Sequence, residues 1–234
     1  MNASAGPLFQ EEEVRKIRSR FFATLPLYIM VPAALAIAFM FAGGHAIDWK
    51  AFGLGAAGWF AALLLRGPIA ALVMKLPQSA AQTINVSSSG VLEESVRLIL
   101  LGLTAATLSE ALSIGQGWAA IEVIYTIIAG LATLSLLGRT DDKAKQAQAM
   151  LAAQGTAHLH PIWGVMERLF ASLFHIGATL LIAAEPWLAA VLIPVHSLLN
   201  LSALWLMKRS ILLVEGLIAV VGTGVMLAGW LLFQ

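Results

Sequence analysis

Residues 211–233 read ILLVEGLIAVVGTGVMLAGWLLF. A transmembrane helix needs about 20 mostly apolar residues, whereas a barrel strand needs only about 10 residues of alternating character. Hydrocarbon offers no water to unpaired backbone groups, so only helices and closed barrels cross it. This long, continuous apolar run therefore predicts a membrane-spanning helix at the C-terminal end of the chain.

Six further apolar runs of this kind precede it. They lie near 22–42, 51–75, 90–110, 113–137, 161–184 and 187–207. Together the runs predict an all-α, polytopic transmembrane helix bundle of about seven spans, which forms a single domain over residues 1–234. A short interfacial helix is expected before the first span, a polar linker over 77–90, and a surface helix near 141–153.

The composition agrees with a membrane protein. Of 234 residues, 59% are hydrophobic and 12% are charged, whereas soluble domains have about 45–50% apolar and 25% charged residues. The net charge of +1 gives no reason to expect a nucleic-acid partner, so the expected surroundings are the lipid bilayer. The chain has no cysteine, which excludes a disulfide framework, a cysteine zinc site and a cysteine nucleophile.

Positive charge predicts the orientation, because cytoplasmic loops are enriched in Lys and Arg. With seven spans, the basic clusters all fall on the side of the N-terminus, which is then cytoplasmic. Lys50 is the exception on the opposite side. The expected location is the bacterial cytoplasmic membrane. The clustered cations are Arg15, Lys16, Arg18, Arg20, Lys75, Arg139, Lys143, Lys145, Lys208 and Arg209.

Ionisable residues in the third span are the first candidates for a site. A charged residue at the centre of a span costs about 2.5–3.5 kcal/mol on insertion scales, so such residues usually face the bundle interior. Glu93 and Arg97 are four apart and can pair on one helix face, while Glu94 points about 100° away, toward another helix. A carboxylate beside a guanidinium stays ionised, as a general base must. The same residues also suit a capping cluster at a helix N-terminus.

The next two spans carry further polar residues. In the fourth span, Gly115 and Gly117 permit close helix packing, and Glu122 lies in an apolar run in the outer half. The fifth span begins with Glu167-Arg168, and His175 lies about 12 Å deeper at 1.5 Å per residue. Glu122 can serve a site or simply bridge two helices, and a lone His is often a satisfied interior residue.

The sixth span supplies His196 and Asn200, which are four apart and project to the same side. An imidazole and a carboxamide can donate hydrogen bonds to a developing oxyanion or ligate a metal, or can simply join two helices. Arg66 in the second span is interpreted as a snorkelling residue or the mark of a broken helix. Trp59 and Trp118 are interpreted as residues of the interfacial aromatic belts.

Taken in order, four motifs resemble those of the YhfC family. This family belongs to the superfamily of type II CAAX-prenyl-protease-like and PrsW-like intramembrane proteases. The resemblance covers about half the chain, from the third to the sixth span. The motifs are Glu93-Glu94-x-x-Arg97, Gly115-x-Gly117-x-x-x-x-Glu122, Glu167-Arg168 with His175, and His196-x-x-x-Asn200.

The resemblance implies roles for the matched residues. Glu93 or Glu94 would be the glutamate that activates water, and Arg97 would orient it. His196 and Asn200 would stabilise the tetrahedral oxyanion. Glu122 and His175 match YhfC-type positions whose counterpart in the prenyl proteases is a water-polarising His, so the Glu at this position is a departure from that pattern.

These residues lead to an intramembrane peptidase that hydrolyses a membrane-associated peptide or protein, with a cavity open toward the cytoplasmic half. A glutamic mechanism and a metal-dependent one are both open. A divalent metal such as zinc would be held by Glu93, Glu122, His175 and His196. A non-catalytic scaffold of the same fold, for which a gamma-secretase subunit of this superfamily is the precedent, and a transporter or proton pathway are the alternatives.

Overall fold

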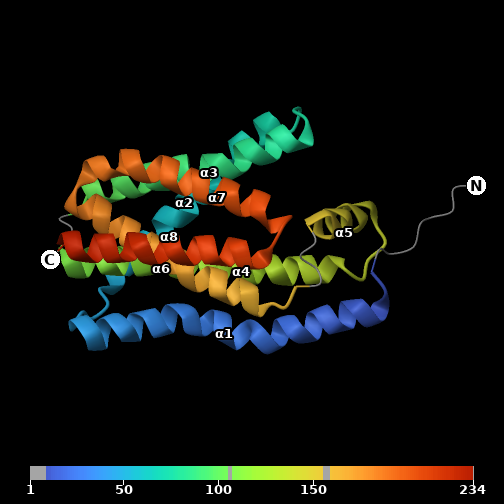
Figure 1. The fold of residues 1–234 in the computed structure, drawn as a ribbon, viewed down its shortest axis with the longest axis horizontal. Helices are drawn as coiled ribbons and strands as arrows, with labels where there is room; N and C mark the ends of the chain where they lie inside the picture. The colour runs from blue at the N-terminus through green and yellow to red at the C-terminus, as the bar shows by residue number, and fades with distance from the viewer. Residues whose placement is uncertain (1–8, 105–106, 155–158, 234) are drawn as a thin grey trace, which may run out of the picture.

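The computed structural model describes residues 9–104, 107–154 and 159–233, and within these ranges it contains helices and no strand (Figure 1). The all-α prediction is confirmed. In chain order the elements are α1 (Glu11–Gly43), α2 (Trp49–Val73), α3 (Gln78–Gly102), α4 (Leu108–Leu136), α5 (Asp142–Gln154), α6 (Ile162–Ala184), the 3-10 turn η1 (Pro186–Leu188), α7 (Ala189–Met207) and α8 (Ile211–Phe233).

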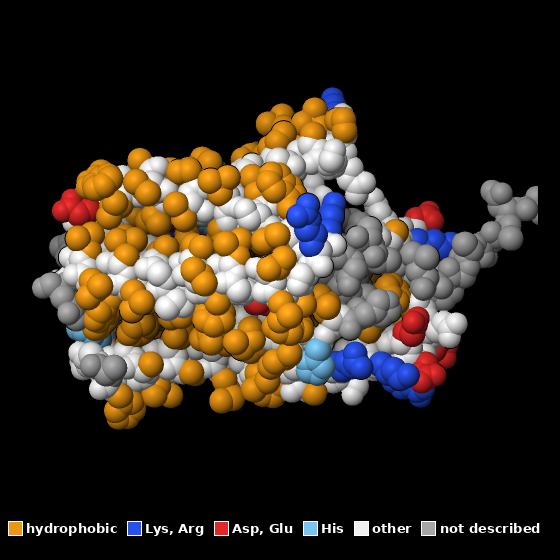
Figure 2. Space-filling view, viewed as in Figure 1, with side chains coloured by type: hydrophobic (Ala, Val, Ile, Leu, Met, Phe, Trp, Pro, Cys, Tyr) orange, Lys and Arg blue, Asp and Glu red, His pale blue; other side chains and the backbone are white. Residues whose placement is uncertain are grey.

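Six helical segments are long and apolar enough to cross a membrane. They are α1, α2, α4, α6, η1 together with α7, and α8. Large apolar side chains cover much of the face of the bundle seen in Figure 2, and Phe41, Leu72 and Val220 are each more than 70% exposed. Water does not favour such a surface, whereas lipid does. The chain is therefore an integral membrane protein.

The first helix is longer than the sequence indicated. α1 is continuous from Glu11, so the separate interfacial helix expected before residue 22 is wrong. Gln10 and Glu13 form a capping box at its start, and Glu11 to Glu13 place negative charge in the first turn, where it stabilises a helix. Gly44 ends the helix in the left-handed conformation, at φ 66°, which glycine adopts without strain.

The polar segment 77–90 is helical, so its prediction as a linker is wrong. α3 begins at Gln78, directly after Pro77, and runs through three consecutive serines. The hydroxyls of Ser87, Ser88 and Ser89 donate to carbonyls three residues earlier, at 3.2, 3.0 and 2.7 Å. These bonds satisfy the serine side chains within the helix, and its polar first half keeps α3 outside the six apolar segments.

Helix α4 begins five residues before the predicted start at 113, at Leu108. The cause is a capping box in which Thr107 accepts from the Glu110 amide and the Glu110 side chain accepts from the Thr107 amide. α3 ends at Gly102, short of the predicted 110, and residues 105–106 of that predicted span lie outside the described part of the chain.

A surface helix after α4 was predicted near 141–153, and α5 confirms it. Asp141 begins it by accepting from the Ala144 amide at 3.2 Å. The hydrogen bond from Arg139 lowers the pKa of the exposed Asp141 carboxyl, which keeps this cap ionised at neutral pH. The Gln148 amide then ties α5 to α4 by donating to the carbonyls of Leu136, Leu137 and Arg139.

Helix α4 lies between α2 and α6, and glycines bring the backbones together. A Cβ at Gly117 would lie 1.9 Å from the Phe52 carbonyl oxygen of α2, and one at Gly55 would lie 1.9 Å from that of Ile114. On the α6 side, a Cβ at Gly115 would lie 2.8 Å from the Cα of Ile176. Only glycine allows this approach, so the prediction that Gly115 and Gly117 are packing sites is confirmed.

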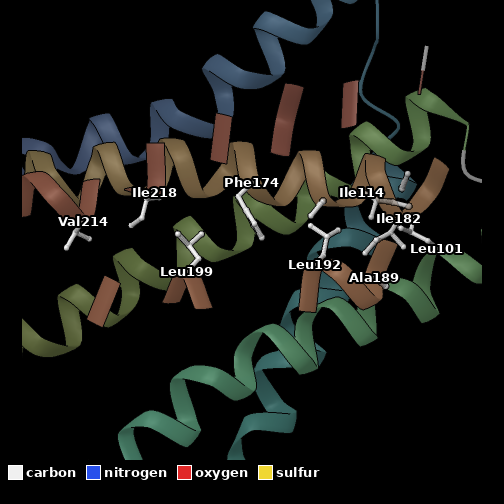
Figure 3. Close-up of a cluster of buried hydrophobic side chains, with 11 residues drawn as sticks. Leu101, Ile114, Phe174, Ile182, Ala189, Leu192, Leu199, Val214 and Ile218 are labelled. Carbon is white, nitrogen blue, oxygen red and sulfur yellow. The ribbon is translucent and has the colours of Figure 1, made fainter. Parts of the chain in front are cut away.

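An apolar core joins α6, α7 and α8 to α2, α3 and α4. Figure 3 shows its side chains, with Phe174 of α6 facing Leu192 and Leu199 of α7. Phe174 also contacts two imidazoles, with its ring centroid 5.6 Å from that of His175 and 4.9 Å from that of His196. This core therefore forms one apolar wall of the region in which the polar residues meet.

Candidate active site

Side chains from five helices meet inside the bundle in one set, which we call the polar cluster. Glu94, Arg97 and Trp118 are completely buried, and Glu93, His175 and His196 are at most 4% exposed. The cluster thus joins all four sequence motifs, one each on α3, α4, α6 and α7. Its members are Arg66, Glu93, Glu94, Arg97, Trp118, Glu122, Arg168, His175 and His196.

Arg97 pairs with Glu94 rather than with Glu93, so the expected pairing of Glu93 with Arg97 is wrong. The Nε and Nη2 atoms of Arg97 donate to the two oxygens of Glu94 at 2.9 and 3.4 Å. Residues three apart also share a helix face, and the side of α3 that carries Glu94 and Arg97 faces α6 and α7. Glu93 projects instead toward α2 and α4.

The Arg97 guanidinium also fixes the position of α6. Its Nη1 donates to the His175 carbonyl at 2.9 Å and to the Thr179 hydroxyl oxygen at 2.6 Å. Its Cζ lies 4.2 Å from the ring centroid of Trp118, which is a cation–π contact. A buried cation is stable only with such partners, and Arg97 has them on α3, α4 and α6.

The bonds around His175 identify its tautomer. Arg97 can only donate, so the Nδ1 atom of His175, 3.0 Å from Nη2 of Arg97, must accept. The Nε2 atom therefore carries the proton and donates to Glu122 at 2.7 Å. The other Glu122 oxygen accepts from Arg168 at 2.6 Å, and Arg168 also pairs with Glu167. Glu122, in the middle of α4, therefore joins the cluster through its contacts with His175 and Arg168 of α6.

His196 has the opposite tautomer. Its Nδ1 atom lies 2.8 Å from Glu94, whose oxygens already accept from Arg97, so this nitrogen carries the proton and donates. No described residue bonds the Nε2 atom of His196, which leaves its lone pair free. The contact between His196 of α7 and Glu94 of α3 depends on Gly90 of α3, where a Cβ would lie 2.5 Å from the Ser197 hydroxyl of α7. Glycine there lets α7 approach α3 closely.

Glu93 is held by Arg66 and Trp118, neither of which was predicted from the sequence to belong to a site. Arg66 of α2 pairs with one oxygen, and the indole nitrogen of Trp118 donates to the other at 3.3 Å. The second oxygen also lies 3.9 Å from Nδ1 of His175. The snorkelling and interfacial-belt interpretations of Arg66 and Trp118 are therefore wrong. Arg66 could have been identified from its charge, because a charged residue within a transmembrane helix needs a buried partner.

Asn200 lies beside the cluster rather than in it. Its side-chain nitrogen donates to the Ser89 hydroxyl at 2.7 Å, which links α7 to α3. One helical turn separates it from His196, and both Asn200 and Ser89 line a neighbouring cavity. A second N–H of the Asn200 amide has no partner among the described residues. Asn200 is thus at the wall of a space that a ligand could enter.

This cavity has a volume of about 490 Å³, and Arg66 and Glu167 join it to the polar cluster. Arg66 is 30% exposed and covers Glu93, of which only 4% is exposed. Helices α2, α3, α4, α6, α7 and α8 all contribute to its walls. The lining residues are Leu63, Arg66, Ala70, Asn85, Val86, Ser89, Tyr125, Glu167, Asn200, Ala203 and Ile218.

The donor atoms of the cluster fit a zinc ion poorly. Glu93, His175 and His196 each offer one atom within 4.8 Å of the others. However, both ring nitrogens of His175 are engaged, by Arg97 and Glu122, and both oxygens of Glu93 accept from Arg66 and Trp118. A zinc ion would have to displace the hydrogen-bond donors Arg66, Arg97 or Trp118 from these ligand atoms. It would then lie beside two guanidinium charges. The four-residue zinc site does not fit this arrangement.

The chemistry available is thus a carboxylate near a cavity, two imidazoles in opposite tautomers, and carboxylates that hold each imidazole. Such groups can activate water and stabilise negative charge. The apolar core beside His196 lowers the local dielectric, which strengthens both effects. A scan against protein-family models and searches of curated proteins and of solved structures find no match to this chain.

Proposed function

We propose that this protein is an intramembrane peptidase that hydrolyses a membrane-associated peptide or protein. One observation carries the proposal: polar residues from α3, α4, α6 and α7 converge in a buried cluster beside a cavity. Buried ionisable groups inside a membrane protein are costly and usually functional. The order of the motifs, which resembles the YhfC family, supports the same class of reaction.

Glu93 is the general base of this proposal. Its carboxylate pairs with Arg66, which lines the cavity, whereas Glu94 pairs with Arg97 and His196, neither of which lines it. Glu93 takes a proton from water as the water oxygen attacks the peptide carbonyl carbon. It then passes that proton to the leaving amine as the C–N bond breaks. Arg66 must move off Glu93 for water to reach it.

His196 and Asn200 stabilise the oxyanion of the tetrahedral intermediate in this scheme. Glu94 accepts a hydrogen bond from Nδ1–H of His196 and orients the ring; when this imidazole is protonated at Nε2 as well, the Nε2–H donates to the oxyanion. The second N–H of Asn200 donates from the cavity wall. Glu94 and Arg97 act as positioning residues, and Glu122 with Arg168 orients the ring of His175.

We place all seven long helices across the bilayer, with α3 as the span that is polar in its first half, and the N-terminus in the cytoplasm of a bacterium. The loops rich in Lys and Arg lie at one end of the bundle (Figures 1 and 2), which supports this orientation. The chain has no cysteine, so one introduced thiol is unique. A membrane-impermeant maleimide is expected to modify Glu185→Cys in intact cells, and Lys143→Cys only in inverted vesicles.

Both positions are exposed, so a failure of access does not explain a negative result. Modification of both variants in intact cells would overturn the seven-span arrangement. Modification of Lys143→Cys alone in intact cells would mean that the orientation is reversed.

The reaction is tested with purified protein in liposomes, a library of membrane-associated peptides and ¹⁸O-labelled water. Hydrolysis is expected to create new C-terminal carboxylates that carry one ¹⁸O, which mass spectrometry detects. The possible metal ligands Glu93 and His175 accept hydrogen bonds from guanidinium and indole groups, so no metal ion is expected to take part in the reaction. Treatment with the chelator 1,10-phenanthroline is therefore expected to leave the rate unchanged.

Two results would contradict this scheme in different ways. Labelled products that disappear on chelation and return with zinc would replace the glutamic mechanism by a metal-dependent one. No labelled product from any peptide, together with a stoichiometric membrane protein that co-purifies, would identify a non-catalytic scaffold instead.

A further inference from the structure

A second cavity, separate from the polar cluster, lies between the end of α7 and the start of α8. Its volume is about 640 Å³. None of its lining residues belongs to the polar cluster or lines the first cavity. The residues that line it are Ser202, Trp205, Leu206, Lys208, Arg209 and Leu217.

Two cations form the polar end of this cavity. Lys208 and Arg209 lie in the turn between α7 and α8, where Figure 2 shows basic side chains bordered by apolar surface. Neither has an acidic partner within the described ranges. Two other cations at this end of the bundle are paired, Lys16 with Glu12 and Arg139 with Asp141, each at 2.7 Å, whereas Lys75 and Lys143 also have no acidic partner in the described part of the chain. The pair at 208–209 is thus free to bind an anion.

The rest of the cavity is apolar and faces outward. Trp205 is 60% exposed, and Leu206 and Leu217 continue the wall. Exposed tryptophan is typical of the level of the lipid headgroups. A small soluble anion would use the two cations and leave this wall uncovered, whereas an acyl chain would cover it.

The depth of Ser202 also suits a lipid. Ser202 precedes Lys208 by six residues, or about 9 Å along the helix toward the bilayer centre. This offset places a hydroxyl donor deeper in the bilayer than a phosphate that lies on Lys208 and Arg209, on the side where the esters and acyl chains follow. Along the cavity, the cations come first, then the Ser202 hydroxyl and then the apolar wall. A phospholipid has its phosphate, esters and acyl chains in the same order.

We propose that this cavity binds one anionic phospholipid, with the phosphate on Lys208 and Arg209, an ester carbonyl on Ser202, and an acyl chain along Trp205 and Leu217. Basic pockets between transmembrane helices at the cytoplasmic side bind anionic headgroups in this way. The site is separate from the proposed peptidase site, because none of its lining residues belongs to the polar cluster or lines the first cavity.

Native mass spectrometry of the protein in detergent micelles tests the site, with phosphatidylglycerol as the probe and phosphatidylcholine as the neutral lipid. The Lys208→Gln/Arg209→Gln variant is expected to bind phosphatidylglycerol about 30-fold more weakly, at about fivefold per cation. The matched control Lys143→Gln/Lys145→Gln, which removes the same charge from α5, is expected to bind as the wild type does. Inorganic phosphate in large excess is expected not to displace the lipid.

Tryptophan fluorescence locates the bound lipid. Brominated phosphatidylglycerol is expected to quench the wild type more than brominated phosphatidylcholine does, and Trp205→Phe is expected to remove that difference. Equal loss of affinity in the α5 control would show that general surface charge attracts the lipid and would overturn the site. Unchanged affinity in the 208–209 variant, or displacement by phosphate, would also overturn it. Peptide hydrolysis is not a readout, so these outcomes do not depend on the proposed enzyme.

Discussion

Replacing Glu93 by Gln is expected to lower the rate of peptide hydrolysis by about 10²–10⁴-fold, the usual contribution of a general base. Glutamine keeps the shape of the side chain and an oxygen that can accept from Trp118, but it cannot take a proton from water. The fold should survive, because the contacts of Glu94 and Arg97 with α6 and α7 do not involve Glu93. Circular dichroism and the elution volume in detergent check that the variant is folded.

The matched controls separate the base from other carboxylates. Glu185→Gln alters an exposed side chain at the far end of α6 and is expected to leave the rate unchanged. Glu94→Gln weakens the ion pair with Arg97 and the bond to His196, so it is expected to lower the rate through the position of His196. Full activity of Glu93→Gln with a folded chain would discard Glu93 as the base.

Replacing Arg97 by Leu is expected to lower the free energy of unfolding by about 3–5 kcal/mol, the cost of breaking a buried ion pair by removing one partner. The change leaves the Glu94 carboxylate without its guanidinium in a site that is fully closed to solvent. It also removes the donors to the His175 carbonyl and to Thr179, so α6 loses these two hydrogen bonds to α3.

Denaturation in mixed micelles of detergent and SDS measures this loss. The Arg97→Leu/Glu94→Leu double variant is expected to be less destabilised than Arg97→Leu alone, because it carries no isolated buried charge. Arg139→Leu serves as the control, since that side chain is more than half exposed and its pair with Asp141 contributes little. A double variant that is destabilised by the sum of the two single changes would contradict the coupling of Glu94 to Arg97.

The fold class was predictable because apolar runs of sufficient length can form little else in a bilayer. The helix boundaries were less predictable, because capping and side-chain hydrogen bonds moved them away from the ends of the apolar runs. Pro77 and the serine bonds to backbone carbonyls extend α3 into a polar segment, and the Thr107–Glu110 box starts α4 early. The capping box could have been identified in the sequence, since it has the S/T-x-x-E pattern.

The site was predictable in its members and not in its pairings. The cost of burying charge singled out Glu93, Glu94, Glu122 and His175, and these do meet. Which carboxylate holds Arg97 depends on the rotation of α3 against its neighbours, and spacing alone does not give that rotation. An analysis of each span by itself could not identify Arg66 as the partner of Glu93, because these two residues are 27 positions apart and lie on different helices.

The glycine contacts between α2 and α4 limit how the Arg66 side chain can move away from Glu93. Main chain lies against main chain at Gly55 and Gly117, so α2 cannot slide or turn on α4 without a steric clash. The guanidinium of Arg66 must therefore leave its carboxylate partner by rotating its own side-chain bonds. Helix shifts take microseconds or longer, whereas side-chain rotamer changes are faster. In the proposed mechanism, water therefore reaches Glu93 through a local rotation of the Arg66 side chain, while α2 and α4 keep their positions.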